Sequence, residues 1–180
     1  MRYTDGPRVE VVVHVEAPVS RVWELVADIG LPARLSPELQ RVAWLDGADR
    51  PVVGARFEGF NHHRLLGEWR TVSHVMEADE QRAFAWAVTD PDGRFGEATL
   101  DPARCAAFWR YELAAEPTGT RLRQTVRMGP GRSGVTEVIA QRPEQEEEII
   151  EFRVAELRAG MESTLNGIKA LAETDGPLGR

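Results

Sequence analysis

Three side chains in the middle of the chain have the chemistry to polarise a carbonyl group or to move a proton: Asn61, His63 and Tyr111. His63 is a candidate general acid or base because an imidazole titrates near neutral pH. Asn61 and Tyr111 can orient a carbonyl group through hydrogen bonds. Two alternatives stay open: His63 could be a solvated hairpin residue, and Asn61 and Tyr111 could make only structural hydrogen bonds.

Two amides are expected on the buried faces of strands. Asn61 shares the apolar face of its strand with Phe57, and Gln124 shares its face with Leu122 and Val126. A buried amide needs hydrogen-bond partners, since leaving it unpaired costs about 1–3 kcal/mol. Those partners could be protein groups, or water and a ligand in a pocket.

Aromatic residues alternate with small or charged residues over 82–89 and 106–115. Such rings suit the wall of a pocket that fixes one orientation of a ligand, and the alternative is that they are ordinary core. Over 68–77 the inner face is ambiguous, with Trp69 and Thr71 on one side and Val72 and His74 on the other. The predicted ligand-binding residues are Phe57, Asn61, Trp69, Thr71, Trp86, Tyr111, Gln124, Leu157 and Met161.

Several other chemistries are not expected. His62 and His63 are adjacent on a strand and point to opposite sides, so they cannot both reach one metal ion, and we expect no metal site. The sequence has no Ser-His-Asp order, no phosphate-binding glycine loop and no nucleotide fingerprint. We therefore expect no cofactor. Cys105 is expected to be buried and inert.

Composition also limits the partners. A formal net charge of −7 argues against nucleic acid and anionic membranes, which need a basic surface. No apolar run approaches the roughly 18 residues of a membrane span, so integral membrane association is not expected. The chain has a single cysteine, and its first residues lack the apolar core of a signal peptide. We therefore expect a cytoplasmic protein whose ligand is neutral or apolar.

Periodicity predicts one α+β domain over residues 1–180, with an ordered core from about residue 8 to about residue 173. Helical spacing predicts a helix over 19–29 and a short helical turn over 31–35. Glycines over 129–134 predict a loop that leads into one long helix over 143–173. Alternation predicts seven strands, over 9–15, 40–45, 55–62, 68–77, 82–89, 106–115 and 120–128.

The long helix carries an apolar stripe that another element must cover, as an antiparallel sheet with helices on one face would do. The stripe consists of Ile150, Val154, Leu157, Met161, Leu165, Ile168 and Leu171. A solvated face with local ion pairs is expected at Glu147, Glu148, Glu151, Arg153, Glu156 and Arg158. Ile139, Ile149 and Phe152 lie off the stripe, which would suit a homodimer.

Seven segments carry a resemblance to a known family: APVSRVWELVADIGLPARLSPE, GARFEGFN, GEWRTVSHV, FAWAV, FWRYEL, GTRLRQTV and GIKALAE. In this order they resemble the SRPBCC superfamily, which includes the START, polyketide cyclase/dehydrase and coenzyme-Q-binding groups. The resemblance implies a helix-grip fold, in which a seven-stranded antiparallel sheet curls around the C-terminal helix and leaves a cavity for a hydrophobic small molecule. The superfamily shares no single catalytic set, so the resemblance implies no active-site residues.

Three functions fit these observations. The first is binding or transport of a lipid-like, polyketide-like or aromatic molecule in the cavity, which needs only the cavity and the orienting amides. The second is a cyclase, aromatase or dehydratase that acts on a ligand in the same cavity. The third is a protein-interaction domain of the co-chaperone or toxin type, which predicts an exposed apolar patch and a small or filled cavity.

Overall fold

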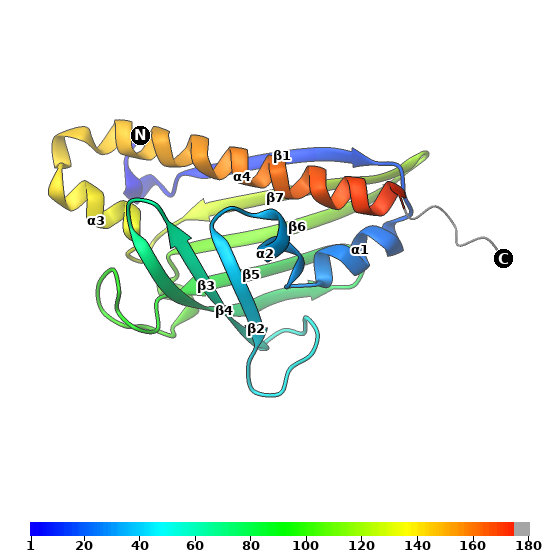
Figure 1. The fold of residues 1–180 in the computed structure, drawn as a ribbon, viewed down its shortest axis with the longest axis horizontal. Helices are drawn as coiled ribbons and strands as arrows, with labels where there is room; N and C mark the ends of the chain where they lie inside the picture. The colour runs from blue at the N-terminus through cyan, green and yellow to red at the C-terminus, as the bar shows by residue number, and fades with distance from the viewer. Residues whose placement is uncertain (175–180) are drawn as a thin grey trace.

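Seven strands form one antiparallel sheet, which confirms the predicted α+β helix-grip fold (Figure 1). The structure is a computed structural model that describes residues 1–174, so residues 175–180 of the predicted domain lie outside the described part. The strands are β1 (Arg8–Val15), β2 (Leu39–Trp44), β3 (Arg56–His63), β4 (Gly67–Asp79), β5 (Ala83–Thr89), β6 (Ala107–Glu116) and β7 (Gly119–Met128). All seven agree with the predicted strands to within a few residues.

The sheet order is β1-β7-β6-β5-β4-β3-β2, so β2 to β7 form a meander and β1 pairs with β7. The chain reaches the opposite edge of the sheet after β1 through two short helices, α1 (Val19–Ala27) and α2 (Leu31–Leu35). The long helix α4 (Glu146–Thr174) lies along β1 and β7, and the sheet curls so that β2 and β3 run at a steep angle to those strands (Figure 1). Residues of α4 and of the concave face of the sheet line one cavity.

One helix was not predicted. Between the loop predicted over 129–134 and the long helix predicted from residue 143 lies α3 (Gly134–Gln141), and α4 begins at Glu146. Ser133 precedes α3, and its backbone N–H donates to the Thr136 hydroxyl at 2.9 Å. Pro143 disfavours helical geometry in the residue before it, and Arg142 accordingly has φ −142° and ψ 66°. The chain therefore turns at Arg142 and forms two helices instead of one.

Most of the predicted stripe of α4 is buried. Ile150, Met161, Leu165 and Ile168 are buried against the sheet and the other helices. Leu171, the last predicted member of the stripe, is 41% exposed, and Ala172 is buried in its place. The reason is that 3.6 residues per turn move an apolar stripe around a helix of this length, so the contact face shifts by one residue near the end.

The apolar residues that suggested a homodimer have partners within the chain. Ile139 and Ile149 pack against the cluster formed by Tyr3, Met128 and Val135, where α3 meets α4. Phe152 is the one of the three that stays exposed, at 49%. The prediction of a homodimer thus loses its support, because the packing of α3 against α4, which the sequence did not predict, gives both isoleucines partners within the chain.

A bulge in β4 resolves the ambiguous strand. The register with β5 shifts between Val75 and Glu77, and Met76 at this point is 45% exposed. Before the bulge, Trp69 and Thr71 lie on the concave face, where they line a cavity. Val72 is buried on the opposite face, so the strand is covered on both sides. Both faces therefore carry apolar residues, which is why the sequence pattern alone did not decide between them.

Candidate functional site

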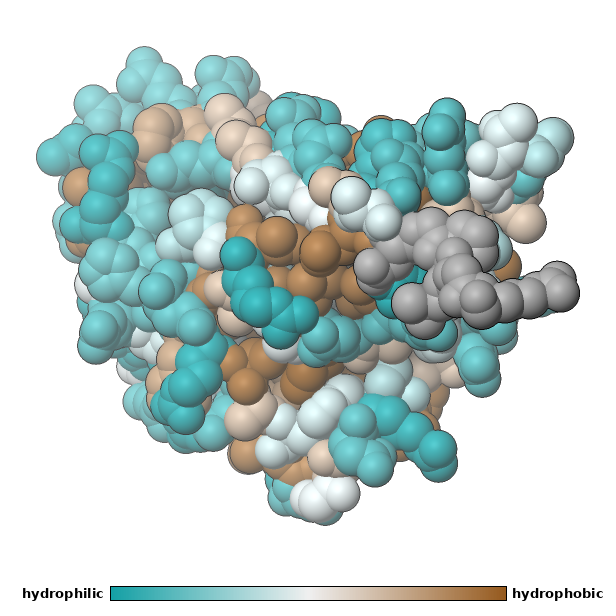
Figure 2. All heavy atoms as spheres, turned by 45° about the vertical axis from the view of Figure 1, so that its right-hand side comes forward, coloured by the Kyte–Doolittle hydropathy of each residue, from teal (hydrophilic) through white to brown (hydrophobic). Residues whose placement is uncertain are grey.

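A cavity of about 620 Å³ lies between the concave face of the sheet and α4, and we call it the central cavity. Its walls come from β2 to β7, from α1 and α2 at one end, and from α3 and α4. Figure 2 shows apolar side chains gathered below α4 in the middle of one face, bordered by hydrophilic side chains. A volume of this size falls within the range of small-molecule sites, roughly 300–1,000 Å³.

The most deeply buried polar residues of the central cavity are Tyr111 and Gln124, which we call the floor pair. They are direct cross-strand neighbours on β6 and β7, and their exposed fractions are 1% and 4%. Within residues 1–174 neither the Tyr111 hydroxyl nor the Gln124 amide makes a hydrogen bond, and Gln124 Oε1 is a buried atom without a partner. Burial raises the pKa of Tyr111 above its ordinary value, so the phenol stays protonated at neutral pH.

An aromatic wall continues from the floor pair toward the rest of the cavity. The Trp86 ring lies 5.6 Å from the Tyr111 ring and stacks on Trp109, with centroids 6.3 Å apart and planes at 10°. Phe57 packs on Trp86 from the side of β3, at 6.1 Å. Trp86 and Trp109 are half-buried and line the cavity. These rings give a flat apolar surface on which another ring system could stack.

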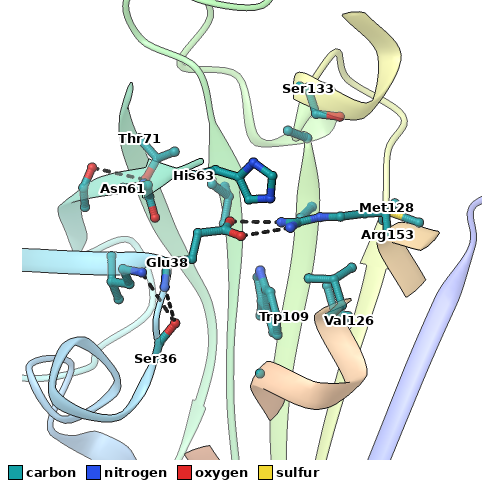
Figure 3. A pocket seen from close by; sticks show the side chains of 18 of the residues that line it. Ser36, Glu38, Asn61, His63, Thr71, Trp109, Val126, Met128, Ser133 and Arg153 are labelled. Atoms are coloured by element: carbon teal, nitrogen blue, oxygen red, sulfur yellow. Dashed lines mark hydrogen bonds and ion pairs between the residues drawn. The ribbon is translucent and has the colours of Figure 1, made fainter. Parts of the chain in front are cut away.

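A second polar group lies on β3 and β4. Asn61 Nδ2 donates to Thr71 Oγ1 at the long distance of 3.5 Å, and the Thr71 hydroxyl donates to the Gly59 carbonyl at 3.4 Å. Asn61 and Thr71 both line the central cavity and point toward each other from adjacent strands (Figure 3). The Asn61 amide is therefore held only weakly by the protein and can bond a ligand.

Charged residues line the central cavity at its α4 side. Arg153 donates two hydrogen bonds to Glu38, at 2.8 and 2.9 Å, and so joins α4 to the segment before β2 (Figure 3). Arg153 also lies 3.5 Å from Glu156, and Glu156 accepts from His63 Nε2 at 3.3 Å. We call these four residues the charged bridge. Burial lowers the pKa of Arg153, but the two glutamates outweigh that effect and raise it overall, so the guanidinium stays charged.

The hydrogen bonds of His63 define its tautomer. The backbone N–H of Leu65 donates to His63 Nδ1 at 3.2 Å, so the ring hydrogen of the neutral imidazole is on Nε2, which donates to Glu156. Both nitrogens are thus occupied in this conformation. His63 could exchange a proton with a ligand only if it left one of these partners, whereas its neighbour His62 is exposed on the other face.

All nine predicted ligand-binding residues line the central cavity, as does His63. The alternation of each strand placed these side chains, because residues two apart share a face. The sequence interpretation was wrong for Arg153 and Glu156, which are half-buried and line the cavity instead of belonging to a solvated face. Glu148 also lines the cavity but is exposed, as predicted. Arg153 follows Ile150 by three residues and precedes Leu157 by four, so helical spacing could have placed it beside the stripe. Nothing in the sequence pointed to Glu38, which is 115 residues from Arg153.

Comparison with known proteins identifies the family. Residues 6–162 match the family model described as polyketide cyclase / dehydrase and lipid transport. The chain belongs to this family. Membership in the polyketide cyclase/dehydrase family confirms the resemblance to the SRPBCC superfamily, and it makes a hydrophobic small molecule the expected kind of ligand. No curated protein sequence matches the chain.

Solved structures of cyclase-like proteins share the fold. A polyketide cyclase-like protein from Corynebacterium glutamicum, Cgl2372, is 27% identical, with a TM-score of 0.63 over 93% of this chain and 92% of that one. The Zhui aromatase/cyclase from a Streptomyces species is 20% identical, with a TM-score of 0.62 over 94% of each chain. The di-domain aromatase/cyclase StfQ of the steffimycin biosynthetic pathway is 12% identical, with a TM-score of 0.68 over 93% of this chain and 50% of that one.

Two further findings concern residues 1–174. No group of three or more His, Cys, Asp or Glu side chains in this part of the chain is arranged to hold a metal ion. No helix there is both long and apolar enough to cross a membrane.

Proposed function

We propose that this member of the polyketide cyclase/dehydrase family binds a hydrophobic, ring-containing small molecule in the central cavity and sequesters or carries it. The observation that supports this most is the cavity itself, which combines about 620 Å³ with a wall of stacked aromatic rings. Each Å² of apolar surface removed from water contributes about 25 cal/mol to binding, so an apolar ligand of several rings gains most from such a wall.

The proposal can be tested with pyrene, a neutral ring compound without polar groups, and a variant that fills the cavity. Gly160 on α4 lines the central cavity, and a Cβ added there meets no atom within 4 Å. The variant Gly160→Leu therefore extends a side chain into the cavity without a clash at its first carbon. Ala159→Leu adds the same side chain at the preceding, exposed position and serves as the matched control.

Binding is measured by quenching of tryptophan fluorescence, since three tryptophans line the cavity: Trp69, Trp86 and Trp109. We expect wild-type protein and Ala159→Leu to bind pyrene with equal affinity and Gly160→Leu to bind at least about tenfold more weakly, a loss of about 1.4 kcal/mol. The proposal would be refuted by a wild-type protein that does not bind pyrene, or by equal affinities in all three proteins. In a separate experiment, native mass spectrometry of freshly purified protein would identify a bound physiological ligand by its mass.

Catalysis is the second candidate function, and the contact between His63 and Glu156 favours it. A histidine held by a carboxylate in an apolar cavity can transfer a proton once it releases one of its two partners, and Tyr111 could polarise a carbonyl as a neutral donor. A cyclase of this kind would accelerate ring closure of a synthetic poly-β-ketone, and the rate of this reaction can be measured by absorbance. His63→Gln should lose this acceleration and keep its affinity for pyrene. Equal rates with and without protein would exclude this candidate.

The third function, a protein-interaction domain, has weaker support because it predicted a small or filled cavity. A cytoplasmic location remains a prediction that fits a single cysteine, Cys105, which is buried and forms no disulfide within the chain. Fractionation of the producing cells would test it.

A further inference from the structure

The floor pair has hydrogen-bonding groups that the protein leaves unused. Tyr111 and Gln124 are both more than nine-tenths buried, face each other across β6 and β7, and line the central cavity. Other side chains buried to the same degree are satisfied within the chain: Thr89 donates to the Val72 carbonyl and Thr120 to the Ala17 carbonyl, each at 2.8 Å. A buried polar group without a partner requires an explanation, and a group of a ligand in the central cavity could supply the partner here.

The surroundings of the floor pair exclude a charged ligand group at this place. Val11 and Val126 lie beside Gln124 on the sheet, Trp86 packs on Tyr111, and Met161 of α4 lines the same cavity. A charge in such an apolar environment would have neither water nor a counter-ion, and burying it would be costly. The contacts given for Tyr111 and Gln124 on the sheet are with apolar or aromatic neighbours, and no charged residue is among them. The group that bonds the floor pair is therefore neutral.

The donors and acceptors of the floor pair limit further which neutral group of a ligand can bind there. The Tyr111 hydroxyl can donate and accept, and the Gln124 amide has two donors and one acceptor oxygen. The terminal torsion of glutamine is soft, so the amide can turn either its oxygen or its nitrogen toward the cavity. A ligand carbonyl only accepts and would leave Gln124 Oε1 unpaired. A hydroxyl can accept from Tyr111 and donate to Gln124 Oε1 at the same time, so it gives a partner both to the phenol and to the buried amide oxygen.

We propose that Tyr111 and Gln124 form a binding site for a neutral hydroxyl group on the inner end of the ligand, so that the protein selects hydroxylated ring compounds. This inference rests on the proposed function, because it needs a ligand whose apolar body occupies the central cavity. It adds the chemical class of the ligand and its orientation, with the hydroxyl group toward the sheet and the ring body against the aromatic wall.

The test compares 1-hydroxypyrene with 1-methylpyrene at neutral pH. The two probes have nearly the same shape, and they differ in the group that can form hydrogen bonds. Their dissociation constants are measured by tryptophan quenching for wild-type protein, Gln124→Leu, Tyr111→Phe and the control Thr125→Val. Thr125 follows Gln124 on β7 and points to the opposite face of the sheet. Tyr111→Phe removes one hydroxyl that has no partner in the protein, so it keeps the test valid if Gln124→Leu does not fold.

We expect wild-type protein and Thr125→Val to prefer 1-hydroxypyrene. The preference should fall by about tenfold in Gln124→Leu and in Tyr111→Phe, which corresponds to 1.4 kcal/mol. Affinity for 1-methylpyrene should not fall in either variant. If wild-type protein binds both probes equally, the hydroxyl site is wrong while the proposed function stands. If neither these probes nor pyrene bind, the proposed function fails, and the inference fails with it.

Discussion

The ion pair between Glu38 and Arg153 connects two segments that are 115 residues apart. Its contribution to the free energy of unfolding of the protein can therefore be measured. The perturbation is a double-mutant cycle with Glu38→Gln, Arg153→Met and the combined variant. Each substitution removes a charge and keeps most of the volume of the side chain. Arg153→Met also leaves the aliphatic part of the arginine in place, so packing against α4 is little changed.

The structure sets the expected magnitude of the coupling. An exposed ion pair contributes about 0–1 kcal/mol, whereas breaking a fully buried pair costs about 3–5 kcal/mol. The side chains of Arg153 and Glu38 are 19% and 27% exposed, and their contact is bidentate, which places the pair between these limits. We expect a coupling of about 1–2 kcal/mol, because the remaining contact with water weakens the attraction. Arg153→Met should be the more harmful single change, since Glu156 also loses a cation at 3.5 Å.

Urea unfolding of the four proteins gives the coupling free energy directly. A second measurement is the rate at which pyrene leaves the cavity, which should rise in each single variant because the charged bridge ties α4 to the segment before β2 (Figure 3). Arg158→Met is the matched control, since Arg158 is an exposed arginine on α4 that donates to the Glu10 carbonyl. A coupling of about zero, together with an unchanged release rate, would refute the role of this pair.

Three further predictions concern stability and reactivity. Gln124→Leu should raise the free energy of unfolding of the ligand-free protein by about 1–3 kcal/mol in urea, because it removes a buried atom without a partner; a loss of stability would contradict this. Burial and the charge of Arg56 lower the pKa of His74 below its ordinary value of 6.5. As the pH falls through 6.5, the unfolded chain therefore binds a proton at this residue before the folded protein does, and the free energy of unfolding decreases. His74→Gln should flatten that part of the pH profile measured by urea unfolding. Burial also raises the pKa of the Cys105 thiol, so native protein should react slowly with a disulfide reagent and rapidly once unfolded, and fast native reaction would contradict its burial.

The strand pattern predicted the inner wall of the site, because alternation has a fixed period and each face of the sheet follows from it. Asn61, Tyr111 and Gln124 could therefore be placed on the concave side without any knowledge of their neighbours. The face of β4 could not be decided in this way, since it depends on a bulge at Met76 that the sequence does not mark. Its two sides are both partly apolar, so the pattern fitted either choice.

The parts of the site that were not predicted depend on contacts distant in sequence. α3 is a single short helix whose stability comes from Val135 packing onto Tyr3 and Ile150, and such packing overrides weak local preferences. The pairing of Glu38 with Arg153 likewise exists only because the sheet curls until β2 faces α4. A single sequence shows each residue of such a pair and does not show that the two meet.

The distribution of polar groups then fixes how a ligand can lie in the cavity. Neutral groups, Tyr111 and Gln124, are at the floor, whereas the charges of Glu38, Arg153 and Glu156 are partly exposed at the α4 side. Burying a charge without a partner costs far more than burying a neutral group with one, so a ligand with both kinds of group gains most when its charged end stays near the charged bridge. We therefore expect one orientation for any ligand that carries both a hydroxyl and an ionised group, with the hydroxyl inward. The reverse orientation would place an unpaired charge beside Trp86 and leave the floor pair unsatisfied.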